Sequence, residues 1–144
     1  MADTISNTIH VDIVSAEGEI FSGAAKMVFA PGTQGELGIA PRHAPLLTLL
    51  KAGEVRVQPP EGEEQAFYVG GGVLEVQPRS VTVLADTALR AKDLDESAAL
   101  AAKQRAEEML REKVDKIEQA EAFAELARAA AQLKLIERLR KVRG

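Results

Sequence analysis

The chain has 144 residues, enough for one ordinary domain or for a small domain with an appendage. Its apolar fraction of 46% excludes wholesale disorder, and the absence of cysteine excludes disulfides, thiol nucleophiles and thiolate metal sites. The formal net charge is −4, and basic residues exceed acidic ones only in residues 121–144, by 6 to 3. With 4 Phe and 1 Tyr as its aromatic residues, the chain does not have the pattern of a nucleic-acid-binding protein.

The N-terminal residues lack the pattern of a signal peptide, and no run approaches the roughly 20 apolar residues of a membrane span. We therefore expect an intracellular protein without direct membrane insertion.

Residues 1–92 alternate short apolar runs with glycine and proline. Residues 9–14 alternate apolar and other side chains with a period of two, as a strand does. Similar runs lie at residues 19–21, 26–30, 46–50, 54–57, 66–69, 73–76 and 80–85. Pro78 lies between the last two and predicts a hairpin turn, because proline fixes its own φ and cannot donate to a ladder. Many short strands at this spacing predict a β-sandwich or flattened barrel.

Three consecutive glycines, residues 70–72, precede one of these runs. A phosphate-binding loop would need the N-terminus of a helix after it, whereas a strand is predicted here. We therefore interpret the glycines as a tight crossing between two strands.

The glycine-rich stretch 32–45 looks too long for a simple hairpin connection, and loops of this kind often carry function. Its ionisable residues are Glu36, Arg42 and His43, and no nucleophile or second carboxylate lies beside His43 in sequence. Leu37 and Ile39 are expected to anchor it, either in the core or against a partner.

His10 and Asp12 are expected on one face of the first strand. Together with His43 they could bind a metal, but without a ligand-spacing motif exposed strand residues are the favoured interpretation.

Residues 94–143 contain neither glycine nor proline, and 12 alanines fall between positions 98 and 131. One continuous helix would be about 70 Å long, so the segment must fold back on itself or reach a partner. A turn within residues 113–121 is favoured. An apolar stripe is expected in the first helix at Ala99, Ala102, Ala106, Leu110, Val114 and Ile117. In the second helix, one face is expected to run through Phe123, Leu126, Ala127 and Ala130 and to continue as Lys134, Arg138 and Lys141.

Four long runs, at residues 11–23, 35–57, 67–95 and 124–141, resemble the ε subunit of bacterial F-type ATP synthase, in order and over nearly the whole chain. The resemblance implies a flattened β-sandwich in residues 1–92 that docks the γ subunit and the c-ring. It implies a regulatory two-helix antiparallel hairpin, able to extend, in residues 93–144. The function implied is that of a non-catalytic rotor subunit in the central stalk of a proton-translocating synthase, peripheral to the cytoplasmic face of the bacterial inner membrane. Such a subunit couples γ to the c-ring and inhibits ATP hydrolysis.

The resemblance also implies roles for particular residues. The c-ring-facing loop would contain Gly35, Glu36, Leu37 and Gly38, and the γ-facing segment Arg42, His43 and Ala44. Basic residues that would press against the catalytic α and β subunits when the helices extend are Arg128, Lys134, Arg138, Arg140, Lys141 and Arg143. No catalytic residue, metal or cofactor is implied.

An ATP-binding motif found in some members corresponds to Leu94, Asp95, Ala98 and Ala99. Ala98 stands at the position of the motif's arginine, the group best suited to phosphate, so nucleotide binding is not predicted. The alternative function is a free-standing β-sandwich adaptor or chaperone with a helical arm. An independent enzyme finds no support in the sequence.

Overall fold

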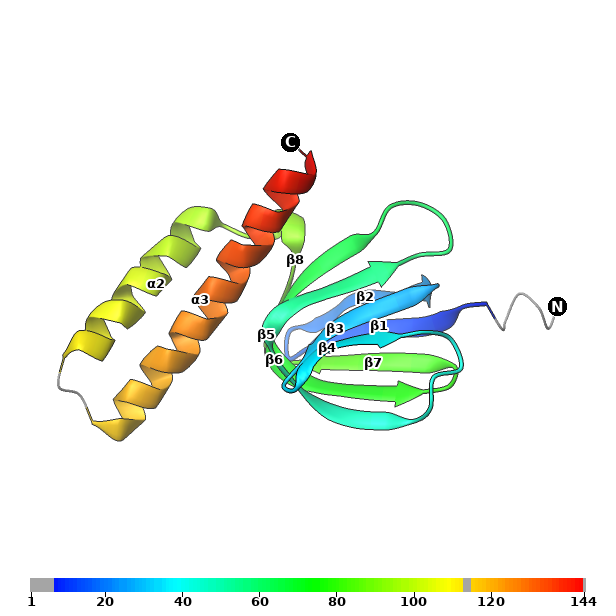
Figure 1. The fold of residues 1–144 in the computed structure, drawn as a ribbon, viewed down its shortest axis with the longest axis horizontal. Helices are drawn as coiled ribbons and strands as arrows, with labels where there is room; N and C mark the ends of the chain where they lie inside the picture. Colours follow the sequence, from blue (N-terminus) through cyan, green and yellow to red (C-terminus); the bar gives the residue numbers. More distant parts are fainter. Residues whose placement is uncertain (1–6, 113–114, 144) are drawn as a thin grey trace. The chain divides into compact units, whose positions relative to one another are not determined.

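The computed structural model describes residues 7–112 and 115–143, and it divides the chain into two compact units, Met1–Arg90 and Ala91–Gly144. The first unit is built from strands and the second from helices (Figure 1).

The strand unit is one sheet whose neighbours follow the order β2-β1-β7-β6-β5-β3-β4, with β8 paired to β6. The strands are β1 (Ile9–Ser15), β2 (Gly18–Ala25), β3 (Met27–Gly32), β4 (Gly35–Ile39), β5 (Leu46–Gln58), β6 (Gln65–Gln77), β7 (Ser80–Ala85) and β8 (Ala88–Arg90). β1 and β7 are parallel, and the other pairs are antiparallel. The sheet folds over on itself, so the predicted β-sandwich is confirmed (Figure 1).

Alternation along β1 and β7 places every second side chain in the hydrophobic core, to which the other strands also contribute. Val11 and Ile13 of β1, Val83 of β7 and Val57 of β5 are fully buried there. The predicted hairpin at Pro78 is also confirmed, because Gln77 at the end of β6 pairs with Ser80 at the start of β7.

β5 and β6 are each 13 residues long, and each joins two segments that the sequence pattern had separated. Residues 70–72 therefore do not separate two strands, but they do mark a tight approach of one strand to another, as interpreted. Gly71 and Gly72 lie within β6 with φ values of +103° and +143°. A Cβ at Gly72 would lie 2.2 Å from the carbonyl oxygen of Leu84, so only glycine fits where β6 passes β7.

The stretch 32–45 is not a single long loop, because it contains the strand β4. Gly32 pairs with Gly35, leaving only Thr33 and Gln34 in the turn between β3 and β4. The sequence pattern missed this strand because two of its five residues are glycines, which weaken the strand signal. Ile39 is fully buried and Leu37 packs against the core, so both anchor to the sandwich itself.

The helical unit consists of the 3₁₀ helix η1 (Ala91–Asp93) and the α-helices α2 (Glu96–Arg111) and α3 (Lys116–Arg143). The two α-helices run antiparallel, so the segment folds back on itself as expected (Figure 1). Each begins at an aspartate cap. Asp95 Oδ1 accepts from the backbone N–H of Ala98 at 3.2 Å, and Asp115 Oδ1 accepts from that of Glu118 at 2.8 Å.

The buried faces of the two helices consist mostly of alanines at seven-residue spacing. In α2 these are Ala99 and Ala106; in α3 they are Ala122 and Ala129, joined by Leu135, and all five have exposed fractions of 3% or less. The small alanine side chains allow two helices to approach closely. The α2 stripe was thus predicted in part, although Val114 lies outside the described residues.

The predicted α2 stripe does not continue into α3, because Ile117 is 72% exposed. The face of α3 that carries Phe123 is not its buried face, because Phe123 is 54% exposed whereas the neighbouring Ala122 is 1% exposed. Phenylalanine is the more hydrophobic residue, but the smaller alanine is buried because it lets the two helices pack closely.

Candidate functional site

The hairpin of β3 and β4 carries the residues expected to face the c-ring. Gly35 begins β4 with φ +135°, a conformation that favours glycine at the turn. Glu36 points outward with 58% of its side chain exposed, whereas Leu37 faces the core. Gly38 is exposed, and a Cβ there would lie 2.9 Å from Met27 Cε. The hairpin therefore presents one carboxylate flanked by two glycines.

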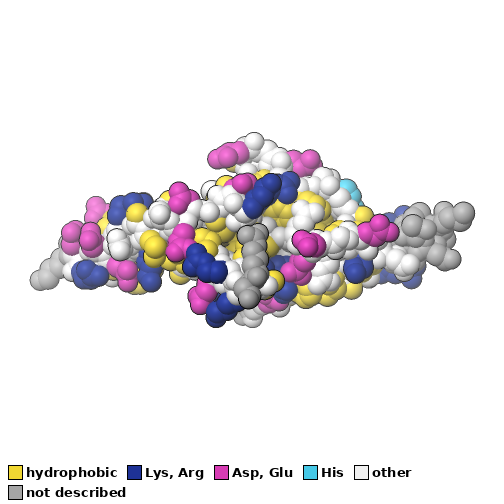
Figure 2. Space-filling view, turned by 90° about the horizontal axis from the view of Figure 1, so that it is seen from above, with side chains coloured by type: hydrophobic (Ala, Val, Ile, Leu, Met, Phe, Trp, Pro, Cys, Tyr) yellow, Lys and Arg dark blue, Asp and Glu magenta, His cyan; other side chains and the backbone are white. Residues whose placement is uncertain are grey.

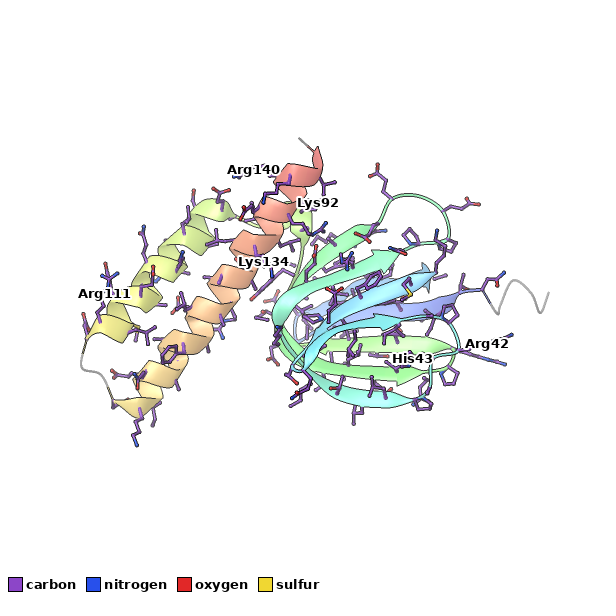
Figure 3. All side chains as sticks on the ribbon, in the orientation of Figure 1. Arg42, His43, Lys92, Arg111, Lys134 and Arg140 are labelled. Atoms are coloured by element: carbon purple, nitrogen blue, oxygen red, sulfur yellow. The ribbon has the colours of Figure 1, made fainter. Side chains whose placement is uncertain are left out.

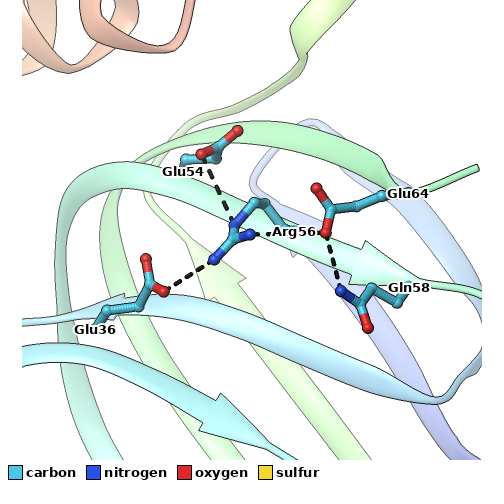
Figure 4. A network of polar contacts seen from close by, with 5 residues as sticks. All are labelled: Glu36, Glu54, Arg56, Gln58 and Glu64. Carbon is cyan, nitrogen blue, oxygen red and sulfur yellow. Dashed lines mark hydrogen bonds and ion pairs between the residues drawn. The ribbon is translucent and has the colours of Figure 1, made fainter. Parts of the chain in front are cut away.

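Arg56 of β5 joins Glu36 to a network of polar contacts that sequence reasoning missed (Figure 4). Its Nη2 donates to Glu36 Oε1 at 2.9 Å, and its Nη1 lies 3.7 Å from Glu64 Oε2. Glu54 Oε1 is 4.0 Å from Nε, and Gln58 Nε2 donates to Glu64 Oε2 at 3.2 Å. Alternation along residues 54–58 could have placed Glu54, Arg56 and Gln58 on one face. It could not have revealed the contact with Glu36, which depends on the register of β3 and β4.

The segment expected to face γ forms a tight turn after β4. Arg42 has φ +66° and is the residue other than glycine with a positive φ in the part of the chain that the structure describes. Its backbone N–H donates to the carbonyl of Pro78 at 2.8 Å, and that of His43 donates to Ala40 at 3.2 Å. The ring Nδ1–H of His43 donates to the carbonyl of Ala44 at 2.8 Å. Figure 3 shows the Arg42 side chain pointing away from the sandwich.

A row of exposed apolar side chains follows this turn along β5. Leu47 and Leu49 are 70% and 60% exposed. Leu49 pairs with Val73 of β6, and Val73 pairs with Leu84 of β7, which is 51% exposed, so the apolar surface extends across the sheet. Sequence reasoning missed this surface, because four of the five residues in the run Leu46–Leu50 are leucine and the run shows no alternation of apolar and polar side chains.

His10 contacts both Asp12 Oδ1, at 3.1 Å, and Ser22 Oγ, at 3.3 Å, through the same ring nitrogen, Nε2. The expectation that His10 and Asp12 share a face is confirmed. A catalytic serine and its orienting carboxylate must contact opposite nitrogens of the ring, so this trio is not arranged as a triad. Among the described residues, no group of three or more His, Asp or Glu side chains is placed to hold a metal ion.

The basic residues expected to inhibit hydrolysis all lie on α3. Lys134, Arg138 and Lys141 share one face by their spacing of four and three residues. Arg140 forms an ion pair with Glu96 of α2, and Lys141 with Glu137 at 3.3 Å. The other members are Arg128, which is exposed, and Arg143, which ends α3 and whose side chain lies outside the described part.

A second ion pair between the helices joins Arg105 to Glu125 at 3.3 Å. Acidic and basic side chains are interspersed over the visible face of the molecule rather than gathered by sign (Figure 2). The basic side chains of α3 are thus partly matched by acidic ones in the hairpin.

The residues of the ATP-binding motif serve the start of α2. Asp95 is its N-cap, Ala99 is buried, and Ala98 supplies only its backbone N–H to the cap. Leu94 is half-buried, and its N–H donates to the carbonyl of Ala91 at 3.2 Å. The motif thus has a structural use in this chain.

Within the described residues, none of the helices has the length and apolar character required to span a membrane.

Comparison with known proteins places both units in one family. Residues 8–91 match the family model of the ATP synthase delta/epsilon chain β-sandwich domain, and residues 92–137 match that of the long α-helix domain. The ATP synthase epsilon chain of Nitrosococcus oceani is 66% identical over 137 residues, which cover 95% of this chain and 98% of the relative. That of Alkalilimnicola ehrlichii is 61% identical over 135 residues, covering 94% and 96%.

A chain in the solved Euglena gracilis mitochondrial ATP synthase assembly (OSCP, F1 and c-ring) has the same fold, with a TM-score of 0.71 at 17% identity. The match covers 97% of this chain and 84% of that one. The sandwich, the helical hairpin and the matches along both units lead to one conclusion: the chain belongs to the ATP synthase delta/epsilon chain family.

Proposed function

We propose that the chain is a non-catalytic central-stalk subunit of a proton-translocating F-type ATP synthase, which couples γ to the c-ring and restrains ATP hydrolysis. The observation that carries the proposal is the family match across both units, together with relatives named ATP synthase epsilon chain. Family membership also argues against a free-standing adaptor and against an independent enzyme. The chain would lie at the cytoplasmic face of the bacterial inner membrane as a peripheral part of the complex.

The hairpin of β3 and β4 is the proposed contact with the c-ring. β4 is the last strand in the sheet order, so its outer edge is available to a partner. Glu36 supplies an exposed carboxylate there, and the neighbouring glycines allow another backbone to approach closely.

The turn at residues 42–44 and the exposed row along β5 form the proposed contact with γ. The left-handed conformation of Arg42 is held by the hydrogen bond to Pro78, so the turn is ordered before a partner binds. Leu47 and Leu49 lie next to it in sequence and are mostly exposed. Burying a leucine side chain fully contributes about 1.5–3 kcal/mol, so covering these two would stabilise a docked complex.

The helical unit is the proposed brake on hydrolysis. When α2 and α3 separate and extend, the basic side chains of α3 would meet acidic surfaces of the catalytic α and β subunits. The hairpin suits a two-state element, because its buried face consists largely of alanines, which bury little apolar area.

Removal of the helical unit tests the brake. A chain shortened after Lys92 retains the whole sandwich with its own core, and we expect it to assemble with γ. ATP hydrolysis by the catalytic complex should then be faster than with the full chain, measured at equal subunit occupancy. Unchanged hydrolysis would contradict the brake, and failure of the shortened chain to bind γ would contradict docking through the sandwich.

A further inference from the structure

Arg56 occupies the centre of the outer face formed by β4, β3 and β5. In the sheet register it lies opposite Phe29 of β3, which in turn lies opposite Gly38 of β4. The Arg56 guanidinium carbon is 4.2 Å from the centroid of the Phe29 ring. A planar guanidinium stacks well on an aromatic face, and the side chain is only 24% exposed.

The Phe29 ring lies against residue 38, which is glycine. A Cβ at Gly38 would lie 3.4 Å from Phe29 Cε1, at ordinary van der Waals distance, and 2.9 Å from Cε at the end of the Met27 side chain, which is tighter than ordinary contact. The ring therefore lies beside a bare backbone, and the arginine passes over it to reach the edge strand. Gly38, Phe29 and Arg56 thus form a support that extends across three strands.

The other nitrogens of the guanidinium are already engaged. Nη1 faces Glu64, which is itself held by Gln58, and Nε faces Glu54. These contacts fix the orientation of the planar group, so that Nη2 points toward β4. Nη2 donates to Glu36 Oε1 at 2.9 Å, the normal length of a charge-assisted hydrogen bond.

We propose that Arg56 is a positioning residue for the contact with the c-ring, holding the Glu36 carboxylate in the orientation in which the ring meets it. This inference rests on the proposed function, in which the β3–β4 hairpin faces the ring. Arg56 engages Oε1, while 58% of the Glu36 side chain remains exposed, so the carboxylate can still accept a hydrogen bond from a partner. The arginine restricts the rotamers of Glu36 before binding, and so less freedom is lost in the complex.

A double-mutant cycle in the assembled complex tests this role. Full-length chains carrying E36Q, R56Q or both are bound to complexes of γ and the c-ring, and their dissociation constants are measured. Since both single changes abolish the same charge-assisted hydrogen bond, we expect each to weaken binding about three- to tenfold. The double variant should bind no more weakly than the single variant with the larger dissociation constant. The control is K26Q, which removes one positive charge from an exposed site and should leave binding unchanged.

A merely structural role for Arg56 would have a different signature. In that case R56Q would lower the Tm of the isolated chain and its affinity for γ alone. The losses of binding free energy caused by R56Q and E36Q would then add in the double variant. Additive effects in the cycle would therefore overturn the inference. If R56Q lowers Tm more than K26Q does, the cycle is repeated with R56K, which keeps the charge but lacks the planar fork. An additive cycle with R56K would overturn the inference equally.

The cycle also separates this inference from the proposed function. If E36Q alone leaves binding to the c-ring unchanged, the proposed role of the hairpin fails and the inference fails with it. If E36Q weakens binding but R56Q does not, only the positioning role of Arg56 is overturned.

Discussion

The ion pair between Glu96 and Arg140 connects the start of α2 to the end of α3, so it exists only while the helices are folded together. Arg140 is also one of the basic residues proposed to reach the catalytic subunits. Glu96 therefore competes with acidic partner surface for the same guanidinium. Replacing it by glutamine, E96Q, should shift the helical unit toward the extended form.

The size of this shift follows from the exposure of the pair. The side chains of Arg140 and Glu96 are 68% and 41% exposed, which places the pair among surface salt bridges. Such pairs contribute about 0.2–1 kcal/mol, which corresponds to a change of about 1.4- to 5-fold in the equilibrium between hairpin and extended helices. Inhibition of hydrolysis should deepen in the same proportion.

Fluorescence energy transfer can measure the equilibrium directly, because the chain has no cysteine of its own. Dyes attached at A101C and V142C, both at exposed positions, would be close in the hairpin. In one continuous helix they would be about 62 Å apart. High salt should shift the wild-type chain toward the extended form but affect E96Q less, since salt screens an exposed pair.

A matched control is E137Q, which removes an ion pair within α3. Glu137 and Lys141 lie one turn apart in the same helix, so their contact survives extension. E137Q should therefore leave the equilibrium unchanged, whereas R105Q, which removes the contact with Glu125, should act like E96Q. The reasoning is refuted if E137Q shifts the equilibrium as much as E96Q, or if E96Q has no effect.

Substitutions in the sandwich should separate stability from docking. G72A should lower the free energy of unfolding by at least about 1–3 kcal/mol in urea titrations, because the new Cβ would meet the Leu84 carbonyl at 2.2 Å. G62A also lies at positive φ but has open space around it, and equal losses for the two would contradict this explanation. I39A removes a fully buried side chain and should cost about 2–5 kcal/mol of stability. L47A, at a 70%-exposed position, should leave stability unchanged but weaken binding to γ in a pull-down titration, and the opposite pattern would refute the docking surface.

In the described part of the helical hairpin, the buried side chains are four alanines and Leu135, and alanine contributes little apolar area. The ion pairs Arg105–Glu125 and Glu96–Arg140 are exposed and so contribute little stability. A hairpin held in this way can open at a modest free-energy cost, as the proposed brake requires.

Local patterns were enough to identify the class of each unit. Period-two alternation in residues 9–14 and 80–85, with proline at position 78, predicted strands and a hairpin that the structure confirms. The alanine-rich composition of residues 94–143 predicted helices because propensity is a property of the residues themselves. The start of the second helix is marked by Asp115, which caps α3, although no glycine or proline indicates a turn there.

Only the tertiary structure decided what depends on contacts between distant segments. The register of β3, β4 and β5 brings Arg56 to Glu36, and no local pattern specifies a register. Similarly, the close approach of the two helices buries Ala122 and leaves the neighbouring Phe123 exposed. The sequence of a segment determines its preference for helix or strand. Which side chains come into contact depends on how the segments pack, and the candidate docking surfaces depend on those contacts.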